Sequence, residues 1–149
     1  MKIFKLLLLL FTCFLFSTSG FSQADKYWSV TTANRASITP DKAVARLAYP
    51  KVYRLFNLDL AQLHQQLFKV IGTGQHSTVI TLPNADGGIE QFEVWETSNF
   101  VPELQAMFPE IRAFTGKGIT VPGSILKLSI SPEGIQTMTF RIGNESEFI

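Results

Sequence analysis

The hydrophobic and polar positions along the chain predict a series of short elements, of which one is a clear helix. Its apolar residues recur at helical spacing and share one face: Leu60, Leu63, Leu67, Phe68 and Ile71. Asp59 precedes them as a good N-cap, and Gln62 three residues later gives a variant of the capping box. Gly72 and Gly74 end the pattern. Residues 53–58 predict a strand that runs into this helix.

The next segment predicts a β-hairpin. Residues 77–82 are rich in β-branched side chains, and residues 89–97 return as a second strand. The turn at 83–88 contains Asp-Gly, which tolerates the positive φ that tight hairpins require. Alternation sorts the side chains of the second strand onto two faces, with Phe92 and Val94 on one and Gln91, Glu93 and Trp95 on the other.

A second hairpin is predicted near the end of the chain, from residues 124–131 and 135–142 with a turn at 132–134. The apolar residues of its first strand share one face: Leu126, Leu128 and Ile130. The second strand has an apolar face and a polar one, with Met138, Phe140 and Ile142 on the first and Thr137, Thr139 and Arg141 on the second.

The remaining segments predict smaller elements. Residues 27–30 suggest a short strand, and residues 39–41 a turn. Residues 99–108 predict a short helix with Pro102 in its first turn, where a missing N–H costs little. Three apolar side chains share one side of that helix: Leu104, Met107 and Phe108. Residues 116–118, Gly-Lys-Gly, predict a loop.

The order strand, helix, hairpin, helix, hairpin predicts an α+β fold. We expect a mainly antiparallel sheet built from hairpins, with one or two helices packed on one face. The alternation within the strands favours a sheet that is half buried and half solvated. The last residues, Phe148 and Ile149, are apolar, as if a third strand were starting. We therefore expect the sequence to be the front piece of a longer protein.

The first residues have the pattern of a secretory signal peptide. Lys2 and Lys5 precede an apolar run at 6–16, which gives way to small and polar residues at 17–24. The run is too short to span a bilayer comfortably. We expect a signal peptide at 1–23, cleaved near 22–24, and a secreted or periplasmic domain at 24–149.

Two alternatives for this segment are less expected. An uncleaved N-terminal membrane anchor would use the same apolar run. A lipoprotein would need small residues and a completed apolar region before its lipidated cysteine, whereas Cys13 lies inside the run, after Phe11 and Thr12.

Composition changes once the signal is removed. The whole chain has 13 basic and 12 acidic residues; loss of Lys2 and Lys5 leaves 11 basic residues and a net charge of −1. A domain without a basic footprint is a poor candidate for nucleic-acid binding. Cys13 is the only cysteine, so the exported domain of about 126 residues has no disulfide and no thiolate. Its core alone must stabilise it.

The two histidines do not have the spacing of a zinc site. His64 falls on the apolar face of the predicted helix, and His76 lies in a polar loop. A helical zinc pair would want histidines at i and i+4, often with a glutamate between them. We interpret His64 as a packed boundary residue and His76 as a surface residue.

The other candidates for chemistry are three glutamates, a turn, a glycine-containing segment and a sequon. Glu90 and Glu96 share a face of the predicted strand and Glu93 points away, which favours a charged outer edge over a glycosidase pair. Residues 86–88 lack the spaced acidic partners of a calcium loop, so a turn explains them. Residues 72–74 are not followed by the helix that a phosphate loop needs. Residues 144–146 match a glycosylation sequon, which is a weak pattern.

Tyr27, Trp28 and Trp95 have two interpretations. They would form an aromatic binding surface, or they would be partly buried in a core or an interface, which is the more ordinary outcome. No serine has a nucleophile-elbow context. The residues themselves therefore predict no catalytic, cofactor-binding or metal-binding site, and the chain as it stands is not expected to be an enzyme.

Several phrases of the sequence resemble the N-terminal pro-region of bacterial secreted reprolysin-like (adamalysin-type) zinc metallopeptidases. The resemblance covers roughly residues 28–149. The phrases that carry it are YRLFNLD at 53–59, LPNADG at 82–87, VWE at 94–96, PELQA at 102–106, FPEI at 108–111 and SISPEGIQTM at 129–138.

This resemblance implies a following catalytic domain with the zinc motif H-E-x-x-H-x-x-G-x-x-H. The chain contains no such motif, so the zinc ligands and the general base have no counterpart here. Eukaryotic relatives of that family often keep latency with a cysteine on the zinc, which this exported domain lacks. Inhibition would then come from the folded domain covering the cleft, or from its backbone lying in it.

Two hypotheses about function follow. The first is a pro-domain that assists folding of a secreted zinc metalloendopeptidase and delays its activity, with the catalytic domain of the same precursor as partner. The second is a stand-alone exported module that binds a glycan or a protein through a surface at Trp28 and Trp95. An independent hydrolase is weaker, because no residues are available to carry the reaction.

Overall fold

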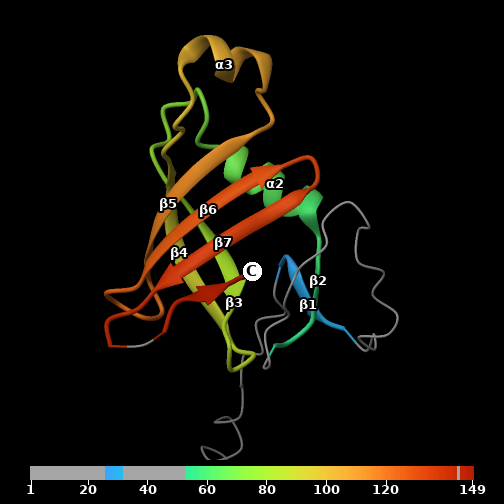
Figure 1. Cartoon of the computed structure of the whole chain (residues 1–149), viewed down its shortest axis with the longest axis vertical. Helices are drawn as coiled ribbons and strands as arrows, with labels where there is room; N and C mark the ends of the chain where they lie inside the picture. The colour runs from blue at the N-terminus through green and yellow to red at the C-terminus, as the bar shows by residue number, and fades with distance from the viewer. Residues whose placement is uncertain (1–25, 32–52, 144) are drawn as a thin grey trace, which may run out of the picture.

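The structure is a computed structural model that describes residues 26–31, 53–143 and 145–149 (Figure 1). The predicted signal peptide at 1–23, the turn at 39–41 and Asn144 of the sequon lie outside the described residues.

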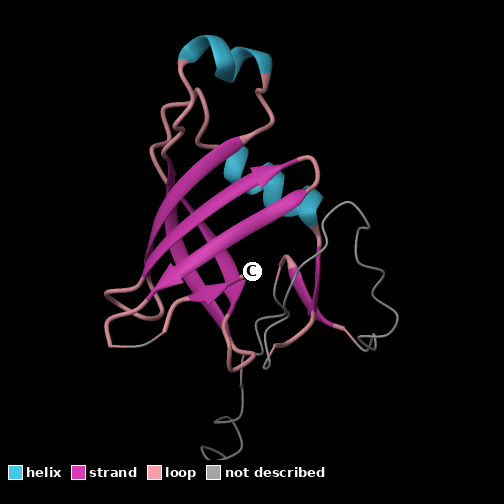
Figure 2. Cartoon of the chain, in the orientation of Figure 1, coloured by secondary structure: helices cyan, strands magenta, loops and turns pink. Residues whose placement is uncertain are grey.

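A six-stranded antiparallel sheet forms the body of the described chain. Each strand pairs with the next one in sequence, so the sheet is a simple meander. In order across the sheet the strands are β3 (Thr78–Pro83), β4 (Ile89–Glu96), β5 (Arg112–Gly118), β6 (Ile125–Ser131), β7 (Gly134–Phe140) and β8 (Glu147–Phe148). The sheet curls, and helix α2 (Leu60–Phe68) crosses its inner face (Figures 1 and 2).

Two smaller pieces complete the described fold. Strands β1 (Trp28–Val30) and β2 (Phe56–Leu58) pair antiparallel beside the main sheet. Helix α3 (Pro102–Met107) connects β4 to β5 and projects beyond the end of the sheet (Figure 2). The predicted α+β fold is thereby confirmed, with α2 as the helix that packs on the sheet.

Helix α2 starts where the sequence predicts. The Asp59 carboxylate accepts hydrogen bonds from the backbone N–H of Gln62 at 3.0 Å and from the side-chain amide of Gln62 at 2.8 Å. These two bonds, the backbone one first, lower the pKa of Asp59. Leu63 and Leu67 are fully buried against the sheet. The helix ends at Phe68, earlier than the apolar pattern suggested, and Ile71 follows it.

The hydrophobic core lies between α2, the inner face of the sheet and β1. Its buried members are Tyr27, Trp28, Leu63, Leu67, Val70, Ile80, Leu82, Phe92, Val94, Phe114, Leu126, Leu128 and Ile130. The predicted inward faces of β4 and β6 are confirmed by this set. Trp28 fixes β1 to the main sheet, because its indole N–H donates to the Thr81 carbonyl at 2.8 Å.

Strand β5 is the main element that the sequence pattern missed. Residues 116–118, predicted as a loop, lie in this strand, between β4 and β6. A Cβ on Gly116 would lie 2.7 Å from Cγ1 of Val94, so a larger residue does not fit the core there. A Cβ on Gly118 would overlap the Ser124 hydroxyl oxygen and the Val121 carbonyl oxygen. Both glycines serve close packing rather than a turn.

Two predicted apolar faces point away from the core. On β7 the alternation is as expected, but Thr137 and Thr139 are buried, whereas Phe140 is exposed. Helix α3 buries none of its residues, and Leu104 and Met107 are exposed. Both faces therefore add apolar surface to the outside of the molecule.

Candidate functional site

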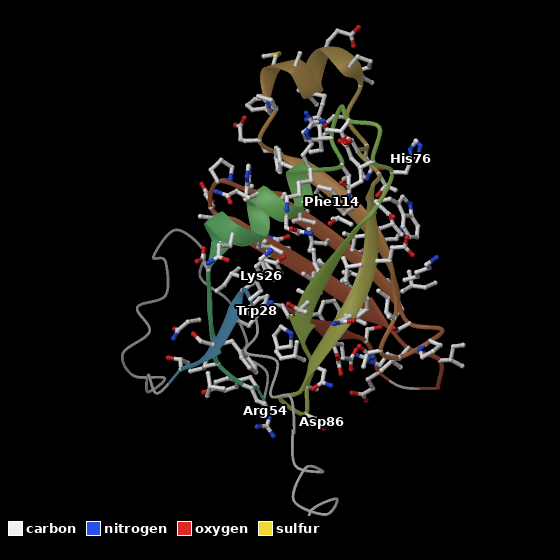
Figure 3. The ribbon with its side chains drawn as sticks, turned by 180° about the vertical axis from the view of Figure 1, so that it is seen from behind. Lys26, Trp28, Arg54, His76, Asp86 and Phe114 are labelled. Atoms are coloured by element: carbon white, nitrogen blue, oxygen red, sulfur yellow. The ribbon has the colours of Figure 1, made fainter. Side chains whose placement is uncertain are left out.

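The histidines lie where the sequence predicted. His64 is half-buried on α2, and its ring stacks on Phe68 with 3.7 Å between centroids and 18° between planes. His76 is exposed before β3, at the opposite end of the sheet from Arg54 and Asp86 (Figure 3). Among the described residues no three His, Cys, Asp or Glu side chains come together as a possible metal site.

The prediction of a charged outer edge at the three glutamates was wrong. Strand β4 lies inside the sheet, between β3 and β5. The prediction failed because the sequence pattern did not reveal β5, the strand that pairs with the second side of β4. Each carboxylate has an ion-pair partner. Glu93 pairs with Lys117 at 2.9 Å, Glu96 with Arg112 at 2.8 Å and buried Glu90 with Arg141 at 2.9 Å.

Glu93 has a second partner, and its acidity changes accordingly. Its carboxylate accepts a hydrogen bond from the Ser77 hydroxyl at 2.7 Å. Hydrogen bonds from Lys117 and then Ser77, together with the Lys117 charge, lower the pKa of Glu93. A carboxylate held ionised in this way is a poor general acid near neutral pH.

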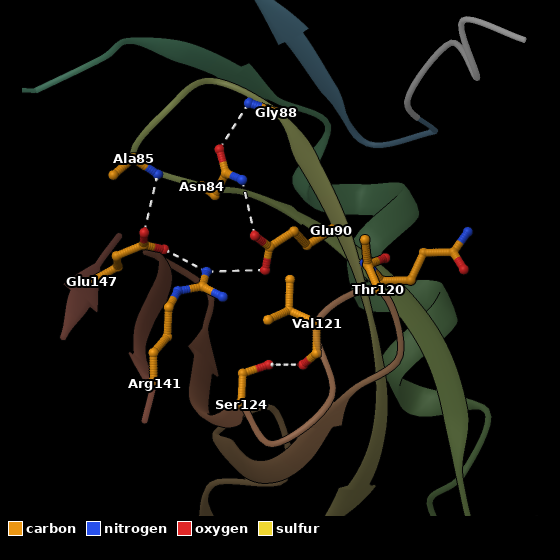
Figure 4. A network of polar contacts seen from close by, with 10 residues as sticks. Asn84, Ala85, Gly88, Glu90, Thr120, Val121, Ser124, Arg141 and Glu147 are labelled. Atoms are coloured by element: carbon orange, nitrogen blue, oxygen red, sulfur yellow. Dashed lines mark hydrogen bonds and ion pairs between the residues drawn. The ribbon is translucent and has the colours of Figure 1, made fainter. Parts of the chain in front are cut away.

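Glu90 is the buried member of a partly buried polar network that the sequence did not reveal. Glu90 accepts from the Asn84 amide at 2.9 Å and pairs with Arg141, which also contacts Glu147 of β8 at 2.7 Å (Figure 4). The other Glu147 oxygen accepts from the Ala85 backbone N–H at 3.4 Å. We call Asn84, Glu90, Arg141 and Glu147 the Arg141 cluster. It ties β8 to the β3–β4 turn.

The partners of Arg141 favour its protonated form. Its hydrogen bond to Glu147, and then those to Glu90, raise the pKa of Arg141 above its already high value despite burial. A permanently protonated guanidinium between two carboxylates leaves neither a free base nor a nucleophile. The cluster therefore has a structural role, fixing the last strand.

The β3–β4 turn supports this cluster. Asn84 closes the turn, because its backbone N–H donates to the Gly88 carbonyl at 2.9 Å and its side-chain oxygen accepts from the Gly88 N–H at 2.8 Å. Gly87 has a φ of +87°, and the Arg54 side chain lies over it and donates to the Ala85 carbonyl at 3.1 Å. The turn interpretation of residues 86–88 is confirmed.

The three aromatic residues do not form one surface. Tyr27 and Trp28 are buried in the core, and Trp28 meets Phe56 edge-on with 6.4 Å between ring centroids. Trp95 projects from the outer face of β4, opposite to the face that carries Val94. A binding surface shared by Trp28 and Trp95 is therefore contradicted. Residues 26–29 and 57–60 line a hollow that is wide open to solvent.

An apolar patch covers the outer face at the end of the sheet. Ile125 lies directly opposite Phe140, and Met138 lies directly opposite Phe148, so these four side chains share that face across β6, β7 and β8. Ile142 follows β7, is 87% exposed, and lies beside Gly123 in the loop before β6. We call Ile125, Met138, Phe140 and Phe148 the outer patch.

A second apolar surface lies on the connection between β4 and β5. We call residues 98–111, which include α3, the arm; it projects beyond the end of the sheet (Figure 1). Five large apolar side chains of the arm are exposed: Phe100, Val101, Leu104, Met107 and Phe108. The helical spacing of the last three was visible in the sequence, but their exposure was not.

The arm is ordered by polar contacts rather than by burial. The Gln105 amide donates to the carbonyls of Phe108 at 2.9 Å and Ile111 at 3.0 Å, and Gln105 also accepts from the Ser98 hydroxyl. At the base of the arm, Arg112 donates to the Pro109 carbonyl at 2.9 Å. The arm is thus preorganised with its apolar side chains facing solvent.

No protein-family model, curated protein or solved structure matches the chain. Within the described residues, no helix is long and apolar enough to cross a membrane. In the part of the chain that the structure describes, the outer patch and the arm are two exposed apolar surfaces, and such surfaces commonly mark contacts with another protein.

Proposed function

We propose that the chain is the exported N-terminal pro-domain of a secreted zinc metalloendopeptidase. The domain assists folding of the catalytic domain that follows it and holds that domain latent. In this proposal the chain itself performs no reaction and binds no cofactor, and the zinc belongs to the catalytic domain. The resemblance of residues 28–149 to reprolysin-like pro-regions supports this assignment.

The outer patch is the structural observation that supports the proposal most. Isolated exposed apolar residues are ordinary, whereas several in contact usually mark a surface that a partner covers. The patch includes Phe148 in β8, the last strand of the described chain. A domain joined after β8 would be held beside the patch at high effective concentration.

Latency in this proposal comes from surface contact. The only cysteine, Cys13, lies within the predicted signal peptide, so a cysteine–zinc bond is not available to the exported domain. A pro-domain that binds the native protease, and not its unfolded chain, stabilises the native form by mass action. The same contact delays activity for as long as it covers the cleft.

The proposal is tested first by the gene sequence downstream of this chain and then by a refolding experiment on the protease domain. We expect the reading frame to continue past Ile149 into a domain with the motif H-E-x-x-H-x-x-G-x-x-H. We also expect that protease domain, denatured and diluted, to refold in higher yield when this domain is present. A stop codon after Ile149 with no protease gene adjacent, or a refolding yield that the domain does not change, would contradict the proposal.

A further inference from the structure

The arm is short, yet its large apolar side chains are exposed to solvent. Val101 is 61% exposed and Met107 is 71% exposed, and α3 contributes no residue to the core. Exposed apolar side chains on an ordered, projecting element are typical of anchors that enter a partner's pocket. Nothing in the described part of the chain covers them.

The arm is already ordered before any partner binds. Gln105 braces it through its three hydrogen bonds, and Pro102 restricts the backbone at the start of α3. Binding therefore costs little ordering of the arm, which favours affinity.

The arm also has a definite charge. Glu103 and Glu110 have no ion-pair partner among the described residues, and the nearest cation along the chain, Arg112, pairs with Glu96. The arm is therefore apolar at its surface and net negative. A surface that complements it is apolar with a basic rim, because opposite charges across an interface steer association and select the partner.

We infer that the arm inserts into an apolar recess with a basic rim on the catalytic domain of the same precursor. This inference rests on the proposed pro-domain function and adds a second contact to it. The arm projects from the sheet (Figure 1), so a surface that receives it is recessed. The arm and β8 lie at different ends of the sheet (Figure 1), so the outer patch and the arm bind at separate places. Two linked contacts bind more tightly than either one alone.

The test uses this domain and the protease domain encoded downstream of it, with inhibition of peptide hydrolysis as the readout. The variant Val101→Ser/Met107→Ser removes two exposed anchors. We expect it to weaken inhibition about tenfold or more. Val30→Ser is the matched control, because Val30 is 78% exposed on β1, away from the arm, and its loss should leave inhibition unchanged.

Charge is tested separately, by a variant that preserves the shape of the arm. Glu103→Gln/Glu110→Gln should weaken inhibition a few-fold at low salt and make it less sensitive to added salt. If inhibition by this variant and by the wild type depends equally on salt, the inferred basic rim on the catalytic domain is overturned. Circular dichroism and thermal midpoints equal to wild type verify that each variant is folded.

The outcomes separate the inference from the function on which it rests. If the wild-type domain inhibits and the Val101/Met107 variant inhibits equally well, the role of the arm is overturned while the pro-domain function stands. If the wild-type domain does not inhibit at all, both fail. Weaker inhibition by the arm variant alone, with the Val30 control unchanged, supports the inference.

Discussion

Arg141 and Glu90 form a buried ion pair, with 2.9 Å between Nη2 and Oε2 and only 10% and 8% of their side chains exposed. The two residues are distant in sequence, and Arg141 also holds Glu147 of β8. The last strand is therefore fixed by charge as well as by backbone pairing. Removing one member of a buried pair is costly, because the other charge stays behind without its partner.

The variant Arg141→Ala should lower the free energy of unfolding by about 3–5 kcal/mol, since it leaves Glu90 buried and uncompensated. Urea unfolding followed by tryptophan fluorescence measures this loss. Lys117→Ala is the control, because Lys117 is well exposed in its ion pair with Glu93 and should contribute little. Equal losses in the two variants would contradict a structural role for the Arg141 cluster.

Gly118→Ala should destabilise the fold by about 1–3 kcal/mol, because the new methyl group meets the Val121 carbonyl and the packed loop must shift. Gly74→Ala is the matched control, since a Cβ there meets nothing within 4 Å. Thermal unfolding of the two variants gives the comparison. A Gly118 variant as stable as the Gly74 variant would contradict the packing explanation for β5.

The N-cap of α2 should make stability depend on pH in the acid range. Hydrogen bonds from Gln62 lower the pKa of Asp59 in the folded state, so the ionised carboxylate stabilises the fold above its unfolded value of about 3.8. That contribution is lost as the pH falls through the lower, folded pKa.

Asp59→Asn tests this dependence, because asparagine keeps the capping geometry without a titrating group. Unfolding midpoints measured from pH 7 down to pH 2 should show the wild type losing stability relative to the variant below about pH 3.8. A difference between the two proteins that stays constant over this range would contradict the prediction.

Gln105→Ala should loosen the arm and leave the core unchanged, since the lost hydrogen bonds all lie within residues 98–111. Hydrogen exchange should become faster at the amides of the arm, with the global unfolding midpoint close to wild type. Gln65→Ala, at an exposed position of α2, is the control and should not affect the arm. Unchanged exchange in the Gln105 variant would show that another contact orders the arm.

Local patterns in the sequence predicted the elements whose signals are local. The N-cap at Asp59 and the turn at 83–88 depend on neighbouring residues, and both are present as expected. Strand β5 was missed because Gly116 and Gly118 favour a loop when read alone, whereas their need for close packing arises from β4 and from the loop after β5.

The candidate sites were less predictable, because they depend on long-range contacts. Glu90 was expected on an exposed edge, and its pairing with distant Arg141, together with the Asn84 hydrogen bond, explains why a carboxylate is buried there. Met107 fits a helical pattern equally well whether its side chain faces a core or solvent. The exposure of the arm and of the outer patch depends on which strands pair with one another. Local sequence patterns do not give that pairing, whereas the structure does.

The most direct test of the pro-domain proposal is a titration of the downstream protease domain with this domain. We expect peptide hydrolysis to fall as the domain is added, and the variant Phe140→Ser/Phe148→Ser to inhibit about tenfold or more weakly, because it removes two large side chains of the outer patch. The Val30→Ser control should inhibit like the wild type. Full protease activity at a saturating excess of the wild-type domain would contradict the proposal.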